Sequence, residues 1–569
     1  MGRLFEEHIT RKVKSLDGLW KFKTDPEDLG TTQNWFEAIP EGESVIVPSV
    51  WNTQHKLLCY EGAVWYEKDF YTDGGCLRLC FGAVMTSAQV WFDGKYIGSH
   101  YGGFSAFDFI IPDVDRGTHR ITVLADNRFD EHSIPQVHVD WYHYGGITRG
   151  VTVETLEGVC VLSNHIDYTL SDDLKSAGVR MKLKLINCNN SDATAPLKAK
   201  INGELIFNGE VKICRNETKE FVIPEINLDN INMWDIGKGN LYNISVETDT
   251  DDLCDRIGFR KIESVNNKIF LNGREIEIRG VNRHEEHPDF GFAFPSALMK
   301  KDIDLILDMG CNAIRGSHYP NSKEFVDFLD ELGILFWSEI PIWGEGFSVE
   351  AIADKTVVER GQVMLEEMLC QYYNHPCIIM WGMHNEIKTE SQPAYDMSKK
   401  YYEYLKQNGG NRLCVYASNR LMDDICFEFT DVICLNQYLG WYGDNIYAWE
   451  KFVDDFIEKR NNLGFEKKPI IFSEFGGAAL YGCHDDEDIM WSEEYQAKLI
   501  SHCLEIFHKH PCVVGSFIWQ FSDMRTCKEA GINRARGFNN KGIVNEYRKP
   551  KLSYYAAGKI YKKSRDEEN

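Results

Sequence analysis

Two glutamates, Glu386 and Glu474, each end a short apolar run, at residues 378–386 and 470–474. Carboxylates are costly to bury unless they have a partner or a chemical role. If the two runs are strands that face one another, their carboxylates would form the minimal machinery for hydrolysing a glycoside. One would protonate the leaving oxygen, and the other would attack or activate water. An ion pair of either glutamate with Arg283 or Arg315 would explain the same residues structurally, so spacing alone leaves both interpretations open.

The chain after Gly273 predicts a framework that would bring these glutamates together. Short apolar runs alternate there with segments of helical period, and eight candidate strands lie around residues 278, 313–314, 335–336, 378–380, 415–416, 432–434, 470–472 and 513–515. Eight βα units in about 300 residues are typical of a closed (β/α)8 TIM barrel, whose active site lies at the C-terminal ends of the strands. Seven of these strands end in groups that would be costly to bury without a role or a partner, at 282–284, 315–318, 338–339, 384–386, 436–438, 473–474 and Trp519.

The first half of the chain has an all-β pattern. Residues 16–157 form short alternating runs cut by Gly, Asp and Asn, and Asp93-Gly94 predicts a tight hairpin turn. Residues 160–260 repeat the alternation at the length of a seven-stranded immunoglobulin-like module. We therefore expect a multidomain chain: a jelly-roll β-sandwich over 1–158, an immunoglobulin-like β-sandwich over 159–260 and a catalytic (β/α)8 barrel over 261–569.

Several longer motifs resemble glycoside hydrolase family two. Residues 373–386 (YNHPCIIMWGMHNE) resemble its acid/base signature, and residues 312–320 (NAIRGSHYP) resemble its second-strand signature. In the first half, residues 17–20 (DGLW), 47–52 (VPSVWN) and 101–104 (YGGF) resemble its sugar-binding jelly roll, and residues 258–260 (GFR) its junction into the barrel. The resemblance implies that Glu386 is the catalytic acid/base and Glu474 the nucleophile.

Within that family, residues 539–542 (NNKG) resemble the motif with which β-glucuronidases hold the C6 carboxylate of the substrate, which implies that Asn539 and Lys541 bind it. The chemistry is sensible, because an ammonium pairs with the anion and an amide adds a directional donor. The family's nearby arginine would fall at Ala535 here. We assign that role to Arg536, with Arg534 on the other side of the gap.

Other substrate-binding residues follow from the same resemblance. It implies contacts with the sugar from Asp140, His284, Asn385 and Trp519, and it places Asn436, Tyr438 and Tyr442 around the nucleophile and the substrate carboxylate. The expected activity is that of a retaining exo-β-glucuronidase, with small-molecule or oligosaccharide β-glucuronides as substrates. A β-galacturonidase or β-galactosidase on the same scaffold, or a non-catalytic carbohydrate-binding protein, remain alternatives. We expect no metal and no cofactor.

Composition indicates which classes of binding partner and which cell compartment are favoured. The excess of 87 Asp and Glu over 62 Lys and Arg gives a net charge of −25, which disfavours nucleic acids and anionic membranes. The chain has no apolar stretch of about 18 residues that could span a bilayer. Its 17 cysteines, an odd number, and the lack of an apolar leader favour a reducing, cytoplasmic location. We also expect a homo-oligomer.

Overall fold

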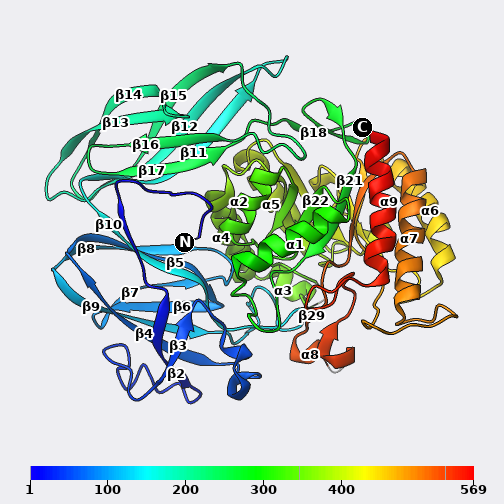
Figure 1. Ribbon diagram of the computed structural model, residues 1–569, viewed down its shortest axis with the longest axis horizontal. Coiled ribbons are helices and arrows are strands. Elements are labelled where there is room, and N and C mark those ends of the chain that lie inside the picture. Colours follow the sequence, from blue (N-terminus) through cyan, green and yellow to red (C-terminus); the bar gives the residue numbers. More distant parts are fainter. Residues whose placement is uncertain (1, 345, 532, 569) are drawn as a thin grey trace.

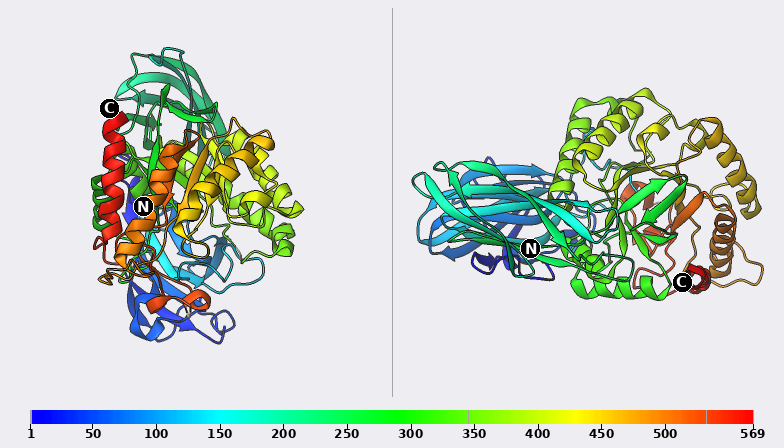
Figure 2. Two further views of the ribbon diagram at one scale, coloured as in Figure 1. Left: turned by 90° about the vertical axis from the view of Figure 1, so that its right-hand side faces the viewer. Right: turned by 90° about the horizontal axis from the view of Figure 1, so that it is seen from above.

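The computed structural model describes residues 2–344, 346–531 and 533–568. Two β-sandwiches lie beside a helix-covered barrel (Figure 1), and the view from above in Figure 2 shows both sandwiches on the same side of the barrel. This confirms the predicted architecture of two sandwiches followed by a TIM barrel.

The first sandwich consists of two sheets. One has the order β1 (Lys12–Ser15), β10 (Gly146–Leu156), β5 (Gly75–Met85), β8 (Phe107–Val114); the other has β3 (Glu43–Val47), β2 (Gly18–Asp25), β4 (Ala63–Thr72), β9 (Gly117–Asp126), β6 (Ser87–Phe92), β7 (Lys95–Tyr101). Alternate apolar residues of both sheets meet in one core. The predicted hairpin joins β6 to β7, and Asp93 and Gly94 both have positive φ (49° and 74°), as such a turn requires.

The second sandwich has the seven strands expected of an immunoglobulin-like module. Its sheets have the orders β11 (Val159–Leu170), β12 (Ser176–Asn187), β15 (Thr218–Asp229) and β14 (Glu204–Ile213), β13 (Ala193–Ile201), β16 (Tyr242–Glu247), β17 (Asp252–Ile257). A small sheet of β18 (Ile262–Val265), β19 (Lys268–Leu271) and β20 (Arg274–Glu275) then leads into the barrel.

The barrel is closed by eight parallel strands in chain order. They are β21 (Ile278–Arg283), β22 (Ala313–Gly316), β23 (Leu335–Glu339), β24 (Ile378–Asn385), β25 (Leu413–Ser418), β26 (Ile433–Asn436), β27 (Ile470–Phe475) and β28 (Val513–Ile518). Each coincides with one of the eight runs predicted from the sequence. The helices are α1 (Ser296–Asp308), α2 (Lys323–Leu332), α3 (Val349–Ala353), α4 (Lys355–Tyr372), α5 (Gln392–Asn408), α6 (Trp449–Asn462), α7 (Glu493–Lys509), α8 (Lys528–Gly531) and α9 (Leu552–Glu568).

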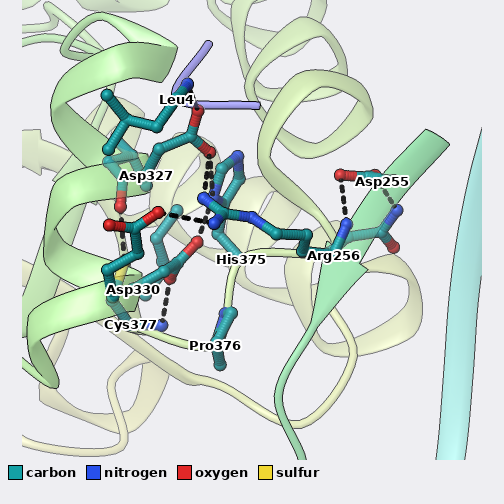
Figure 3. A network of polar contacts seen from close by, with 12 residues as sticks. Leu4, Asp255, Arg256, Asp327, Asp330, His375, Pro376 and Cys377 are labelled. Carbon is teal, nitrogen blue, oxygen red and sulfur yellow. Dashed lines mark hydrogen bonds and ion pairs between the residues drawn. The ribbon is translucent and has the colours of Figure 1, made fainter. Parts of the chain in front are cut away.

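A buried polar network fastens the second sandwich and the N-terminal segment to the barrel (Figure 3). Asp327 of α2 accepts hydrogen bonds from the Arg3 guanidinium and from the main-chain N–H of Leu4. Asp330, one turn further on, bonds the His375 imidazole at 2.5 Å and the N–H of Cys377 at 3.0 Å. The network thereby fixes the segment that leads into β24, the strand that Glu386 follows.

A second junction lies between the barrel and the first sandwich. The segment after β28 carries β29 (Met524–Arg525), α8 and β30 (Phe538–Asn539), and Figure 1 shows it next to the first sandwich. Arg525 donates to the carbonyl oxygen of Leu58 at 3.1 Å, and its guanidinium lies 3.7 Å from the ring centroid of Tyr142. The first sandwich therefore lies against the C-terminal face of the barrel. No helix in the described part of the chain has both the length and the apolar character needed to cross a bilayer.

Candidate active site

Glu386 and Glu474 line the same cavity, of about 590 Å³, at the mouth of the barrel. Glu386 follows β24 directly and Glu474 lies in β27. Asn436, at the end of β26, is the register partner of Glu474 and donates from its amide to Glu386 Oε1 at 2.8 Å. The position of Glu386 relative to Glu474 is therefore set in part by Asn436. The main chain of Glu386 has a φ of 54°, a costly conformation for a residue with a side chain, and strain of this kind gathers at functional sites.

Glu474 is held by two donors. Arg315 Nη1 lies 2.8 Å from Oε1, and the Tyr438 hydroxyl donates to Oε2 at 2.7 Å. Burial raises the pKa of Glu474 to about 7, while Arg315 and Tyr438 act in the opposite direction. Glu474 therefore does form the ion pair that the structural interpretation anticipated. The pair also fixes the carboxylate and supports its anionic form, which is what a nucleophile needs.

Arg315 also bonds a second buried carboxylate, that of Glu339. Its guanidinium donates two hydrogen bonds of 2.9 Å to Glu339, at the end of β23, and Glu339 is also 2.7 Å from His318 Nδ1. Burial raises the pKa of Glu339, and Arg315 opposes that rise. A single guanidinium thus forms ion pairs with two glutamates, Glu339 and Glu474.

Lys541 is a buried cation at the edge of this cavity. Lys541 is only 1% exposed. Its ammonium donates to the Tyr442 hydroxyl at 2.5 Å, and the ammonium nitrogen lies 4.9 Å from the ring centroid of Tyr438 and 4.5 Å from that of Tyr442. Among the described residues, no carboxylate comes within ion-pair distance of it. A buried ammonium without an anion is costly, and a substrate carboxylate would relieve that cost.

The first sandwich contributes Asp140 to the same end of the cavity. Its two carboxylate oxygens accept from Arg534 at 2.7 Å and from the Asn539 amide at 3.1 Å. The other side of the Asn539 amide accepts from the main-chain N–H of Lys541 at 3.2 Å. Asp140 and Lys541 line the cavity, whereas Asn539 lies behind them and joins them.

The structure places Arg536 outside the cavity lining, and its predicted role stays a prediction. Its guanidinium donates to Glu546 and to Asn540, each at 2.8 Å, and these bonds hold it away from the cavity. Arg534, two residues earlier, lines the cavity instead. The loop places its two arginines on opposite sides, a geometry that the sequence does not reveal.

The remaining predicted residues divide between the cavity surface and the layer below it. Asn436, Tyr438, Tyr442 and Trp519 line the cavity. Asn385 lies just beneath: its Oδ1 accepts from Arg315 and Asn436, and its buried Nδ2 has no partner in the described chain. His284 is not among the residues that line the cavity, and its contact with the sugar stays a prediction. It is bonded to Tyr319 at 3.1 Å and lies edge-on to Trp519 at 5.6 Å, so it supports that ring.

Sequence reasoning missed part of the lining. Trp343, Asn419 and Leu421 follow β23 and β25 and line the cavity close to Glu386. Asn419 comes directly after β25, and the polar residue at the end of that strand could have been found by the rule applied to the other seven. Trp343 and Leu421 gave no comparable signal, because apolar residues in loops are common.

Among the residues that the structure describes, two groups of side chains away from the cavity could act as metal ligands. One comprises Asp327, Asp330 and His375, whose donor atoms already bond Arg3, Leu4, Cys377 and one another in the network of Figure 3. The other comprises His143, Cys527 and Glu529; in it, His143 Nε2 already contacts the Val137 carbonyl oxygen at 2.6 Å. Neither group faces the two glutamates.

A TIM barrel whose mouth presents two glutamates to one cavity is the arrangement expected of a glycoside hydrolase. The TIM barrel domain of glycosyl hydrolases family 2 matches residues 262–565, the family's sugar binding domain matches residues 13–156, and a further domain of glycosyl hydrolases family 2 matches residues 161–260. The chain belongs to glycosyl hydrolases family 2. Because it is a hydrolase, the alternative of a non-catalytic carbohydrate-binding protein is not supported.

Individual relatives divide between two activities. The chain is 27% identical to a β-glucuronidase of Streptococcus agalactiae over 95% of each chain. It resembles a solved β-galacturonidase of Eisenbergiella tayi bound to galacturonate, with 33% identity, a TM-score of 0.93 and 99% of each chain covered. It also resembles a solved β-glucuronidase of Ruminococcus gnavus in complex with D-glucaro 1,5-lactone, with 27% identity, a TM-score of 0.87 and 99% of each chain covered.

Proposed function

We propose that this chain is a retaining exo-β-glucuronidase, which releases glucuronic acid from β-D-glucuronides. Lys541 is the observation that carries the proposal. It is a buried ammonium, without a carboxylate partner in the described chain, in the same cavity as Glu386 and Glu474. A neutral sugar would leave that charge unpaired, whereas a uronic acid would neutralise it. Arg534 adds a second cation at this end of the cavity.

In the proposed reaction, Glu386 gives its proton to the glycosidic oxygen while a Glu474 oxygen attacks the anomeric carbon. The bond to the aglycone breaks and an ester with Glu474 forms. Water then gives a proton to Glu386 and attacks the same carbon, which releases the sugar and restores both glutamates. Two displacements preserve the β-configuration, so proton NMR should detect β-glucuronic acid as the first product. The α-anomer appearing first would refute retention.

A β-galacturonidase is the second candidate. Glucuronate and galacturonate differ only in the orientation of the 4-hydroxyl, and this chain has Ala535 where the resemblance to glucuronidases calls for an arginine. Arg534 is instead bonded to Asp140, the residue expected to contact the sugar hydroxyls. The 33% identity to the E. tayi enzyme points the same way.

Parallel assays separate the candidates. We expect kcat/KM to be highest for p-nitrophenyl β-D-glucuronide among the matched glucuronide, galacturonide and galactoside. A higher value for the galacturonide would select the second candidate. A preference for the galactoside would contradict both, because Lys541 would then have no role in substrate choice.

We also infer a cytoplasmic location and a homo-oligomer. All 17 cysteines are unpaired in the structure, and a reducing compartment suits such a chain. Size-exclusion chromatography with light scattering tests the oligomer, and a monomer at micromolar concentration would contradict it.

A further inference from the structure

We propose that Trp343, Asn419 and Leu421 form a preformed subsite for the leaving group, and that it takes an apolar ring bearing a hydroxyl or amine donor. The inference rests on the proposed function, because it assigns the part of the same cavity that the uronic acid would not occupy. The same cavity is also lined by Asp140, Arg534 and Lys541, whose charges suit a uronic acid.

Two loops bring these residues to either side of Glu386. In the loop after β23, Gly344 donates its N–H to the carbonyl oxygen of Asn385 at 2.7 Å, which sets Trp343 beside the end of β24. On the other side, the N–H of Glu386 donates to the carbonyl oxygen of Ala417 at 2.9 Å, two residues before Asn419. The group that protonates the leaving oxygen must be close to the leaving group. Its flanking loops are therefore the surfaces that an aglycone would meet.

The chemistry of this surface favours an apolar ring. Trp343 is 8% exposed, and Leu421 and Leu439 are partly buried side chains that line the cavity. Leu421 has a φ of 47°, a left-handed conformation that a leucine adopts only at a cost, and it presents its side chain to the cavity there. Rings and aliphatic side chains bind one another by burying apolar surface.

One polar atom on this surface lacks a partner. Asn419 Oδ1 is buried and accepts no hydrogen bond from the described chain. A buried acceptor that is left unpaired costs free energy, so a donor on the ligand would be favoured at this point. This atom turns a general apolar surface into one that selects a hydroxylated or aminated ring.

The loop that carries Asn419 and Leu421 is held in place by a buried carboxylate, Asp424. Its Oδ2 accepts from Ser418 at 2.5 Å and from Thr389 at 2.7 Å, and its Oδ1 accepts from Tyr416 at 3.0 Å and from the N–H of Cys426 at 2.7 Å. Thr389 lies three residues after Glu386. Asp424 therefore ties the loop to the segment that follows Glu386, and a site fixed in this way loses little entropy when it binds its ligand.

The test compares phenyl and 2-naphthyl β-uronides, because their leaving groups have similar acidity and differ mainly in size. Leu421→Ala should lower kcat/KM for the naphthyl substrate by roughly 5–20-fold, and for the phenyl substrate by a clearly smaller factor. Phenyl turnover shows that the variant is folded, so the ratio of the two substrates is the measurement. Leu463→Ala, at an exposed leucine that follows α6, is the matched control and should leave the ratio unchanged.

A second variant tests the donor. Asn419→Leu should lower kcat/KM for hydroxynaphthyl uronides relative to the parent naphthyl uronide, by roughly 5–20-fold for the best isomer. An unchanged ratio in both variants would overturn the subsite. A wild-type preference for uronyl disaccharides over the aryl substrates would assign it to a sugar and overturn the apolar class. Absence of phenyl uronide hydrolysis by the wild type would instead overturn the proposed function.

Discussion

Replacing Lys541 by methionine tests the charge that we propose selects the substrate. Methionine keeps an apolar stem between the rings of Tyr438 and Tyr442 and removes the ammonium that lies 4.9 and 4.5 Å from their centroids. If that ammonium pairs with the substrate carboxylate, the variant loses a charge-assisted contact of about 1.5–3 kcal/mol, or roughly 10–150-fold in kcat/KM. The loss should be confined to uronides, because a neutral glucoside has no carboxylate to pair.

The assay is a double comparison of matched p-nitrophenyl β-glucuronide and β-glucoside, in the wild type and in Lys541→Met. For the glucoside, we expect an unchanged or slightly improved kcat/KM, since an unpaired buried cation is removed. Lys549→Ala, at an exposed lysine eight residues further on, controls for a general change in charge and should affect neither substrate. Equal losses on both substrates would make Lys541 a structural residue and would remove the main support for uronide selectivity.

Three further predictions concern the chemistry and the cavity. Glu386→Ala should keep some first-step activity on an aryl glucuronide, be rescued by azide and yield the β-glycosyl azide, whereas Glu474→Ala should not be rescued in this way; equal, unrescued losses would contradict the assigned roles. Because burial raises the pKa of Glu474 to about 7, protonation should remove the nucleophile as the pH falls, so kcat/KM should drop below about pH 7 and approach a tenfold loss per pH unit. A profile that stays flat to pH 5 would mean that Arg315 outweighs burial. Arg534→Ala should lower uronide kcat/KM by roughly tenfold or more, and Arg536→Ala by less, since only Arg534 lines the cavity; the reverse order would restore the original assignment.

Much of the fold could be predicted from the sequence because its signals are local and repeated. The apolar residues at 325, 328, 329 and 332 lie on α2, which ends where Gly333 adopts a φ of 66°, and Ser322 caps its start by accepting from the N–H of Phe325. The eight strands were recognisable as short apolar runs ended by polar residues. Such periodic patterns are reliable because the apolar residues of one pattern all face the same side of the helix or strand that they form.

The candidate site was less predictable where it depends on loops. Glu386 and Glu474 could be found because each ends a strand, and the barrel fixes where strand ends point. Arg534 and Arg536 differ by two positions on one loop, and only its path decides which guanidinium faces the cavity. For His284, the strand was predicted correctly, but its imidazole lies edge-on to Trp519 and is not part of the cavity lining.

The residues expected to carry out the reaction and those expected to choose the substrate also differ in whether strands or loops position them. Arg315 and Tyr438 each donate to Glu474 at the strand ends and just beyond them, and we expect a change in any of the three to disturb the reaction itself. Asp140 and Arg534 come from another domain and from a loop, and they meet at the sugar end of the cavity through a single ion pair. That pair can be altered without moving the nucleophile. Selection between glucuronate and galacturonate should therefore respond to exchange of Arg534 and its loop, while the rate on the preferred sugar continues to depend on Glu386 and Glu474.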